Sequence, residues 1–338
     1  MTNALVDLLA QRDWLLLDGA TGTNLFEMGL MSGDAPELWN VDQPEKIRAL
    51  HRSFVEAGSD VILTNSFGGS RYRLKLHHAE DRVFELNKRA AELAREVADE
   101  AGRKVIVAGS VGPTGEILEP VGSLSHADAV AAFEEQIAGL IAGGADVIWG
   151  ETISSEEELR ALAEAAAKQQ APLCATLSFD TAGRTMMGLT SRHYAEIAPG
   201  LAQRPIAIGA NCGTGASDLL RTVLGITDAS PDALVIAKAN AGIPKYVDGH
   251  IHYDGTPELM ADYACLARDA GARLIGGCCG TKPEHLRAMR AALEGHAAGA
   301  RPSLDEIRAK LGDFSSASDG TEAGDEAGGE GRRRRRRG

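Results

Sequence analysis

The stretch PEKIRALHRSFVEAGSDVILT, residues 44–64, contains one helix-to-strand unit of the predicted fold. Its first fifteen residues carry apolar side chains at helical spacing. The run DVILT, residues 60–64, follows at once and is short, apolar and rich in β-branched residues. Strands that are apolar along their whole length are typical of a parallel sheet that is buried on both faces. The stretch therefore predicts a helix packed against a buried parallel strand.

Seven further runs of the same kind recur along the chain, with amphipathic stretches between them. They are WLLLD (14–18), KVIVAGS (104–110), DVIWGE (146–151), LCATLS (173–178), IAIGANC (206–212), ALVIAKAN (233–240) and RLIGGC (273–278). Together with residues 60–64 they make eight strand–helix units, which favours an α/β fold of the (β/α)8 TIM-barrel type. A doubly wound open sheet is the competing architecture, and we favour the barrel because eight units can close.

The composition changes near residue 313. We expect residues 1–312 to form the barrel and residues 313–338 to form a disordered tail, because the tail is polar, glycine-rich and almost without bulky apolar residues. The tail ends in six arginines, Arg332–Arg337. It is either a solubilising segment whose basic end is drawn to the acidic body, or an anchor for an acidic partner or nucleic acid. The net charge of −13 argues against general nucleic-acid binding.

The remaining composition points to a reduced cytoplasmic protein. No run of 18 apolar residues predicts a membrane span, and the N-terminal residues do not resemble a secretory signal. The chain has five cysteines, an odd number without the spacing of a disulfide framework. In a cytoplasmic setting, we expect these thiols to be reduced and available for a metal or for catalysis.

Polar residues stand where the predicted strands end. In a (β/α)8 barrel the carboxyl ends of the strands form the active-site face. A single polar residue at such a position is more often a helix cap than a functional group, but the set as a whole predicts a site. Its members are Asp18, Thr64, Ser110, Glu151, Ser178, Asn211, Cys212, Asn240, Cys278 and Cys279.

Three cysteines of this set are its most specific members. Cys212 ends the sixth predicted strand, whereas the adjacent Cys278 and Cys279 end the eighth and are flanked by Gly276, Gly277 and Gly280. Both neighbouring thiols can reach one centre only if the backbone turns sharply there, which the glycines permit. Three protein ligands and an open fourth position are typical of a catalytic zinc site. For Cys174 and Cys265 we expect a purely structural role.

The ligand type indicates the chemistry. Three thiolates leave a zinc site with a net negative charge, which suits it poorly to polarising carbonyls. The same site suits a substrate thiol, whose pKa of about 8.5 otherwise leaves it mostly protonated at neutral pH. Alkyl transfer to sulfur is therefore the reaction that the sequence predicts. A thiol redox sensor that forms a Cys278–Cys279 disulfide is the alternative, and it would need no zinc.

Several motifs resemble the zinc-dependent homocysteine S-methyltransferase family. They are DGATGT (18–23), TNSFGG (64–69), GPTGE (112–116), GET (150–152), ANCG (210–213), NAG.P (240–244) and GGCCGT (276–281), and the similarity spans roughly residues 10–295. The family includes the homocysteine-binding module of cobalamin-dependent methionine synthase, betaine–homocysteine methyltransferase and S-methylmethionine-dependent enzymes.

The resemblance implies roles for individual residues. One Zn²⁺ per chain would be held by the three cysteines, with the sulfur of homocysteine as the fourth ligand. Asp18 and Glu151 would hold the substrate ammonium group, and Asn211 would support the ligands or touch the substrate. The substrate carboxylate would lie near the backbone of Gly19 and Ala20 and the side chains of Thr64 and Ser110.

The methyl donor stays open between a small betaine-like molecule and a methylcobalamin protein acting as a separate partner. Thr152 stands where the betaine enzymes of animals have a tyrosine, so part of an aromatic cage is missing, whereas Trp39 lies roughly where those enzymes have a tryptophan. The sequence continues beyond the barrel only as the short tail, which leads us to expect a donor that the barrel receives from outside. An oligomer is possible.

Overall fold

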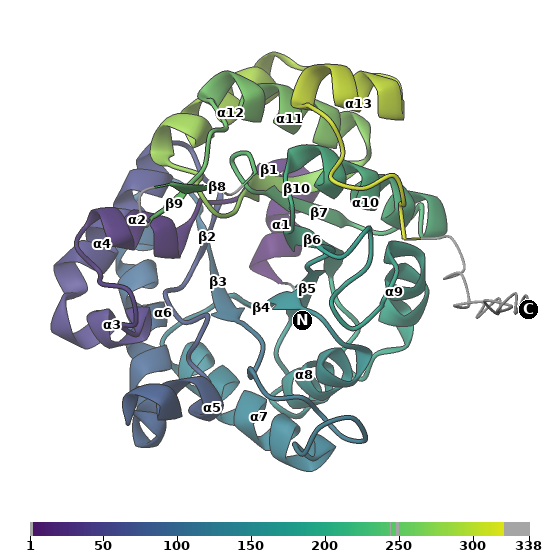
Figure 1. Cartoon of the computed structure of the whole chain (residues 1–338). Helices are drawn as coiled ribbons and strands as arrows, with labels where there is room; N and C mark the ends of the chain where they lie inside the picture. Colours follow the sequence, from purple (N-terminus) through teal and green to yellow (C-terminus); the bar gives the residue numbers. More distant parts are fainter. Residues whose placement is uncertain (1–2, 244, 248–249, 321–338) are drawn as a thin grey trace, which may run out of the picture.

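The computed structural model describes residues 3–243, 245–247 and 250–320. Eight parallel strands form one sheet that curls into a barrel, and the helices surround it (Figure 1). The strands are β1 (Leu15–Leu16), β2 (Val61–Leu63), β3 (Ile106–Val111), β4 (Val147–Ile153), β5 (Leu173–Leu177), β6 (Ala207–Cys212), β7 (Val235–Ala239) and β10 (Ala272–Gly277). Each lies within or overlaps one of the eight predicted runs, so the (β/α)8 TIM-barrel prediction is confirmed.

The strand order closes the barrel in sequence. Neighbouring strands pair in the order β1-β10-β7-β6-β5-β4-β3-β2. A single parallel bridge between Leu17 and Val61 joins β1 to β2, and the Asp60 N–H donates to the Leu16 carbonyl at 2.7 Å. The last seam of the barrel is therefore short but hydrogen-bonded.

The helices alternate with the strands along the chain. They are α1 (Ala4–Gln11), α2 (Thr21–Glu27), α3 (Trp39–Asp42), α4 (Pro44–Glu56), α5 (Arg71–Leu74), α6 (Val83–Glu100), α7 (His126–Ala142), α8 (Glu156–Lys168), α9 (Ser191–Ile197), α10 (Ala216–Ala229), α11 (Pro257–Asp269), α12 (Pro283–Gly295) and α13 (Leu304–Leu311). Side-chain caps fix several of their starts, such as Ser125 before α7 and Ser155 before α8.

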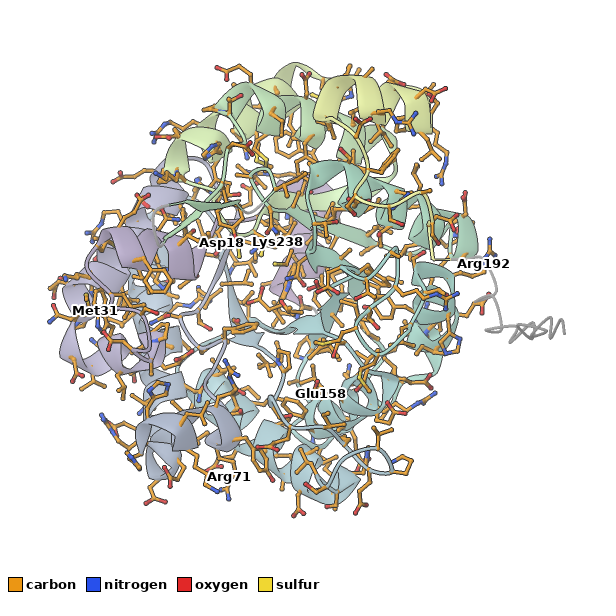
Figure 2. All side chains as sticks on the ribbon, in the orientation of Figure 1. Asp18, Met31, Arg71, Glu158, Arg192 and Lys238 are labelled. Atoms are coloured by element: carbon orange, nitrogen blue, oxygen red, sulfur yellow. The ribbon has the colours of Figure 1, made fainter. Side chains whose placement is uncertain are left out.

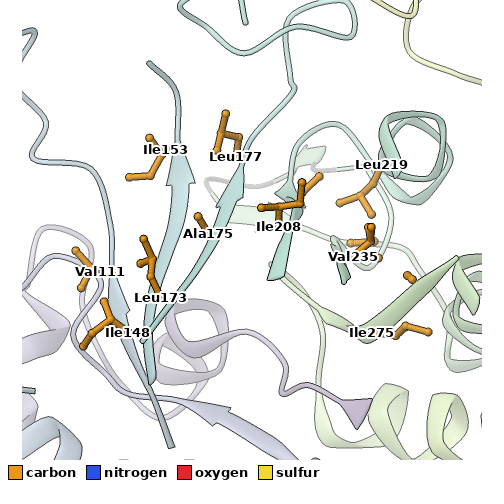
Figure 3. Close-up of a cluster of buried hydrophobic side chains, with 14 of the residues drawn as sticks. Val111, Ile148, Ile153, Leu173, Ala175, Leu177, Ile208, Leu219, Val235 and Ile275 are labelled. Carbon is orange, nitrogen blue, oxygen red and sulfur yellow. The ribbon is translucent and has the colours of Figure 1, made fainter. Parts of the chain in front are cut away.

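Two hydrophobic layers hold the barrel together. The outer layer lies between the strands and the surrounding helices, and Ile148, Leu173 and Leu219 belong to it (Figure 3). The inner layer fills the barrel and includes the buried Trp149. Leu5 and Leu8 of α1 pack into that inner layer, and Asn3 beside α1 donates to the carbonyl of Asp146, which precedes β4. The amino-terminal end of the barrel is thus plugged, which leaves the carboxyl end for a site.

Two features were not expected from the sequence. A short antiparallel hairpin, β8 (Lys245–Val247) and β9 (His250–His252), follows β7 at the carboxyl end of the barrel. Residues 313–320 of the predicted tail are described and contact α10, where the Ser315 N–H donates to Asp218 and Arg221 donates to the Ser316 carbonyl. The rest of that segment, residues 321–338 with the arginine run, lies outside the described residues.

Candidate metal centre and active site

The three predicted cysteine ligands meet at the carboxyl end of the barrel. The sulfur atoms of Cys212, Cys278 and Cys279 all lie within 4.8 Å of one another, and those of Cys212 and Cys279 are 4.0 Å apart. Three sulfurs around one tetrahedral zinc ion lie about 3.8 Å from each other, given Zn–S bonds of about 2.3 Å. The cluster therefore fits a metal ion with little movement, and soft thiolate donors favour zinc among common divalent ions.

The backbone around each cysteine makes this convergence possible. Cys212 ends β6 with a φ of 62°, an unusual conformation for a residue with a side chain. Gly280 has a φ of 77° and lies directly against the ring of Tyr253, so an added Cβ would meet that ring. A Cβ on Gly277 would likewise meet the side chain of Thr281. The flanking glycines thus serve both purposes, a left-handed turn at one position and close approach at another.

The thiols influence each other's protonation. The thiols of Cys278 and Cys279 donate toward Cys212 and lower its pKa, although burial opposes this shift. The same interaction with Cys212 raises the pKa of Cys278. The cluster therefore readily supplies one thiolate, and a cation is needed to hold three.

A cavity of about 480 Å³, called here the cysteine pocket, opens above the three sulfurs. Part of its wall is apolar and includes the exposed side chains of Phe26 and Phe67. The predicted site residues that line it are Gly19, Ala20, Thr64, Ser110, Glu151, Cys212, Cys278 and Cys279. A mostly apolar pocket with a few polar groups at one end is the usual form of a small-molecule site.

Glu151 and the predicted hydroxyls form one hydrogen-bonded chain beside this pocket. Ser110 donates from its hydroxyl to Glu151, and the Ser110 N–H donates to the hydroxyl of Thr64 at 2.9 Å. Thr64 in turn shares a hydrogen bond of 2.6 Å with Ser66. Burial raises the pKa of Glu151 to about 7, even though Lys238 and the Ser110 hydroxyl favour its charged form. Glu151 is thus poised to ionise fully when a cation binds beside it.

Asp18 is not among the residues that line the pocket, and it already has two partners. Its Oδ1 accepts from Lys238 Nζ at 2.7 Å and its Oδ2 accepts from the Leu63 N–H at 2.7 Å. Both side chains of the ion pair are almost fully buried, and Figure 2 shows them side by side near the centre of the barrel. Burial alone would lower the pKa of Lys238, but Asp18 and Glu151 raise it overall, so the ammonium stays charged.

Asn211 connects the metal centre to the end of β4. Its Oδ1 accepts from the Thr152 N–H and the Thr176 hydroxyl, and its Nδ2 donates to the Thr152 hydroxyl at 2.8 Å. Its Nδ2 also lies 3.9 Å from the sulfur of Cys278. These contacts hold Thr152 at a φ of 62° directly after Glu151. Asn211 thereby contacts the sulfur of Cys278 and supports the backbone next to Glu151.

Other expected residues have structural contacts. The Ala20 N–H donates to the Thr281 carbonyl at 3.1 Å and is therefore occupied, although Ala20 lines the pocket. Trp39 is outside the pocket lining within the described part of the chain, and Lys46 Nζ lies 4.4 Å from the centre of its ring. Cys174 is buried within β5, as expected for a structural residue, and burial raises the pKa of its thiol to about 12.

Lys238 and Tyr253 line the pocket but were missed from the sequence. Lys238 interrupts the apolar run ALVIAKAN, and a lysine within a strand that is buried on both faces is a signal that an internal carboxylate is nearby. Tyr253 lines the pocket after the β8–β9 hairpin, and burial together with Cys279 raises the pKa of its phenol. No sequence pattern pointed to Tyr253, because the hairpin itself was not expected.

Comparison with known proteins gives a consistent result for most of the chain. The model of the homocysteine S-methyltransferase family matches residues 15–293. Methionine synthases of Mycobacterium tuberculosis and Mycobacterium leprae are 32% and 31% identical to the chain over 309 residues. Each alignment covers 86% of this chain and 25% of the relative, so the chain spans about a quarter of the length of those proteins.

Solved structures show the same relationship. The metallated form of the homocysteine methyltransferase MmuM from Escherichia coli is 28% identical, with a TM-score of 0.72 over 86% of this chain and 99% of that one. A methyltransferase from Methanosarcina mazei, 13% identical with a TM-score of 0.53, shares the fold. None of the helices in the described ranges has the length and apolar character that a membrane crossing requires. The match over residues 15–293 shows that the chain belongs to the homocysteine S-methyltransferase family.

Proposed function

We propose that this chain transfers a methyl group to the sulfur of homocysteine and so forms methionine. The observation that carries the proposal is the meeting of three thiols from two distant strands at the floor of the cysteine pocket. Three thiolates offer a metal an open fourth position, which a substrate sulfur can take. Membership of the family supports homocysteine as the acceptor.

The metal centre would consist of Cys212, Cys278 and Cys279. When bound there, Zn²⁺ supplies a place where a substrate thiol loses its proton at neutral pH and remains nucleophilic. The chain's own contribution is to hold the three sulfurs in place through the left-handed turns at Cys212 and Gly280 and through Asn211.

The amino-acid end of homocysteine would be held by the polar side of the pocket. Glu151 lines the pocket and, unlike Asp34 and Glu37 there, interacts electrostatically with Cys278, so it is the group we assign to the substrate ammonium. Asp18 would act through Lys238, because both of its oxygens are already engaged. For the substrate carboxylate we assign the backbone near Gly19 and the hydroxyl of Thr64.

The methyl transfer itself needs little from the protein beyond position. The substrate sulfur forms a bond to the methyl carbon while the bond from that carbon to the donor breaks, and the thiol proton has already passed to solvent. Holding two reactants in line supplies much of the rate enhancement of such a step. A small onium compound and a methylcobalamin carried by another protein both satisfy this geometry.

The direct test is methionine formation by reduced, zinc-loaded protein that is given homocysteine and one methyl donor at a time. We would compare betaine, S-methylmethionine and a separate methylcobalamin protein as donors. The proposal predicts turnover with at least one of them, lost in Cys278→Ala and retained in Cys265→Ala, a matched control because Cys265 lies in α11. Zinc-free protein that forms a Cys278–Cys279 disulfide in its place would support the redox-sensor alternative. Full activity of Cys278→Ala would contradict the proposal.

A further inference from the structure

A second cavity, of about 720 Å³, adjoins the cysteine pocket and has no role in the function proposed above. It is called here the acidic cavity, because it is lined by the carboxyl groups of Glu116, Glu119, Glu156, Glu157, Glu158 and Asp180. Only two guanidinium groups, those of Arg73 and Arg184, also line it among the described residues. Phe67, Arg73 and Thr152 line both cavities, so an occupant of the acidic cavity sits at the approach to the cysteine pocket.

Three of these carboxylates are available to a cation. Glu116, Glu119 and Glu157 are exposed, and their side chains have no ion pair with any residue in the described ranges. By contrast, Glu156 pairs with Arg160 and lies 2.9 Å from His193, and Glu158 accepts from Thr114. The carboxyl groups of the cavity outnumber its two guanidinium groups, so the cavity carries a net negative field.

The rim of the acidic cavity is apolar. Val121 and Met186 line it and are 76% and 72% exposed, and Ile117 and Met187 are also exposed there. Long aliphatic stems with charged heads suit such a surface, because the stems cover apolar side chains while the heads reach carboxylates. Among the common side chains arginine fits best, since its planar guanidinium pairs with carboxylates through two hydrogen bonds.

The described chain ends beside this cavity. After α13 it crosses α10 toward α9, as Figure 1 shows. The backbones of Gly183 and Gly320 lie in contact, because a Cβ built on either glycine would meet the other. The neighbouring Arg184 lines the acidic cavity. The chain therefore reaches the rim of the cavity at Gly320, the last described residue.

The arginine run begins twelve residues after Gly320. An unconstrained chain of that length has a root-mean-square span of about 20 Å. Fully extended it reaches about 40 Å. Because the segment starts beside the cavity, the arginines are held at a high effective concentration near its carboxylates.

We propose that the C-terminal arginine run, Arg332–Arg337, binds in the acidic cavity of its own chain. The run carries six guanidinium groups, and the cavity offers three carboxylates without an ion pair and an apolar rim. The described chain ends at the edge of this cavity, which keeps the run near it. The proposal does not depend on the methyl-transfer function, because it concerns binding alone.

Limited proteolysis of the full-length chain tests this binding. Trypsin removes arginines from the run only while they are free, and intact mass spectrometry follows their loss. The variant Glu116→Gln/Glu119→Gln/Glu157→Gln should be trimmed about fivefold faster than the native chain, the effect of losing several exposed charge pairs. The matched control is Asp7→Asn/Asp13→Asn/Glu56→Gln, which neutralises three exposed carboxylates elsewhere on the molecule. Its trimming rate should equal that of the native chain.

A binding measurement provides the second arm. A labelled peptide of residues 331–338 is added to the full-length chain in which Arg332–Arg337 are replaced by alanine, and fluorescence anisotropy reports the Kd. The three cavity substitutions should weaken binding about fivefold, and the control substitutions should leave it unchanged. Equal trimming rates and equal peptide affinities in the two triple variants would overturn the proposal. The proposal would also be overturned if the cavity variant changed only the turnover of a small cationic methyl donor, with trimming rate and peptide affinity unchanged. That result would assign these carboxylates to binding the donor.

Discussion

The buried pair of Asp18 and Lys238 is the most costly feature of the site at the scale of single residues. Its atoms are 2.7 Å apart, and the two side chains are 1% and 3% exposed. A charge buried this deeply is tolerated only because its partner is present. The pair fixes the floor of the cysteine pocket without contributing an obvious ligand of its own.

Replacement of Lys238 alone should therefore strongly destabilise the folded chain. Lys238→Met leaves the Asp18 carboxylate buried and unpaired, and we expect it to lower the free energy of unfolding by about 3 kcal/mol. The double variant Lys238→Met/Asp18→Asn removes both charges and should recover more than half of that loss. Urea denaturation of the three proteins measures both values. A double variant no more stable than Lys238→Met would show that the charge pairing is not what matters.

Glu151 should make stability depend on pH. Its pKa is raised to about 7 in the folded chain from an ordinary 4.5, so the folded state binds a proton that the unfolded state has lost between these values. Stability therefore falls as the pH rises from about 4.5 through 7. Glu151→Gln lacks this pH-dependent loss. Its free energy of unfolding, relative to that of the native chain, should therefore increase by about 2 kcal/mol between pH 5 and pH 8.

Urea denaturation of both proteins at the two pH values gives the measurement. The cysteines titrate in both proteins, so their contribution cancels in the difference. A difference that is the same at pH 5 and pH 8 would mean that Glu151 is already ionised in the folded chain at low pH.

At the scale of elements, the turn after β10 brings Cys278 and Cys279 to one centre. Gly280 adopts a φ of 77° there and touches Tyr253, so a side chain at this position meets both strain and a clash. We expect Gly280→Ala to displace Cys279 and to weaken zinc affinity by at least about tenfold, the usual loss when the support of a metal ligand is disturbed.

Gly22→Ala is the matched control, because a Cβ on Gly22 meets no atom within 4 Å. Competition with a chromogenic zinc chelator gives both affinities. Equal affinities in the two variants would show that the turn at Gly280 does not determine the geometry of the cysteines.

The same elements show how far the sequence alone could lead. The eight apolar runs predicted every strand of the barrel, because burial on both faces leaves a continuous apolar pattern. The proximity of Cys212 to the Cys278–Cys279 pair could be predicted from the sequence, because parallel strands of a barrel end at one face. The partners of Asp18 could not be foreseen, because they depend on which way Lys238 points from β7. The β8–β9 hairpin and Tyr253 were missed because three-residue strands leave little pattern.

At the scale of the whole molecule, closure of the barrel depends on a buried carboxylate. Asp60 accepts from the Leu16 N–H across the β1–β2 seam, and its oxygens also pair with Arg12, Arg103 and Arg290. These arginines come from three separate parts of the chain. One residue thus links the first strand, the second strand and α12.

Asp60→Asn should consequently destabilise the whole barrel. It leaves three guanidinium groups close together without their carboxylate, and we expect a loss of about 3 kcal/mol in the free energy of unfolding. Asp7→Asn, on the exposed side of α1, should change it by less than about 0.5 kcal/mol. Thermal and urea denaturation compare the two. Equal stabilities would mean that the arginine cluster is held by other contacts.

The central claim is that Cys212, Cys278 and Cys279 hold one zinc ion whose fourth position receives the sulfur of homocysteine. X-ray absorption at the zinc edge counts the sulfur neighbours directly, together with metal analysis of the purified, reduced chain. We predict one zinc per chain, with three sulfur neighbours before homocysteine is added and four afterwards. A chain that holds no zinc, or a sulfur count that stays the same when homocysteine is added, would contradict the account.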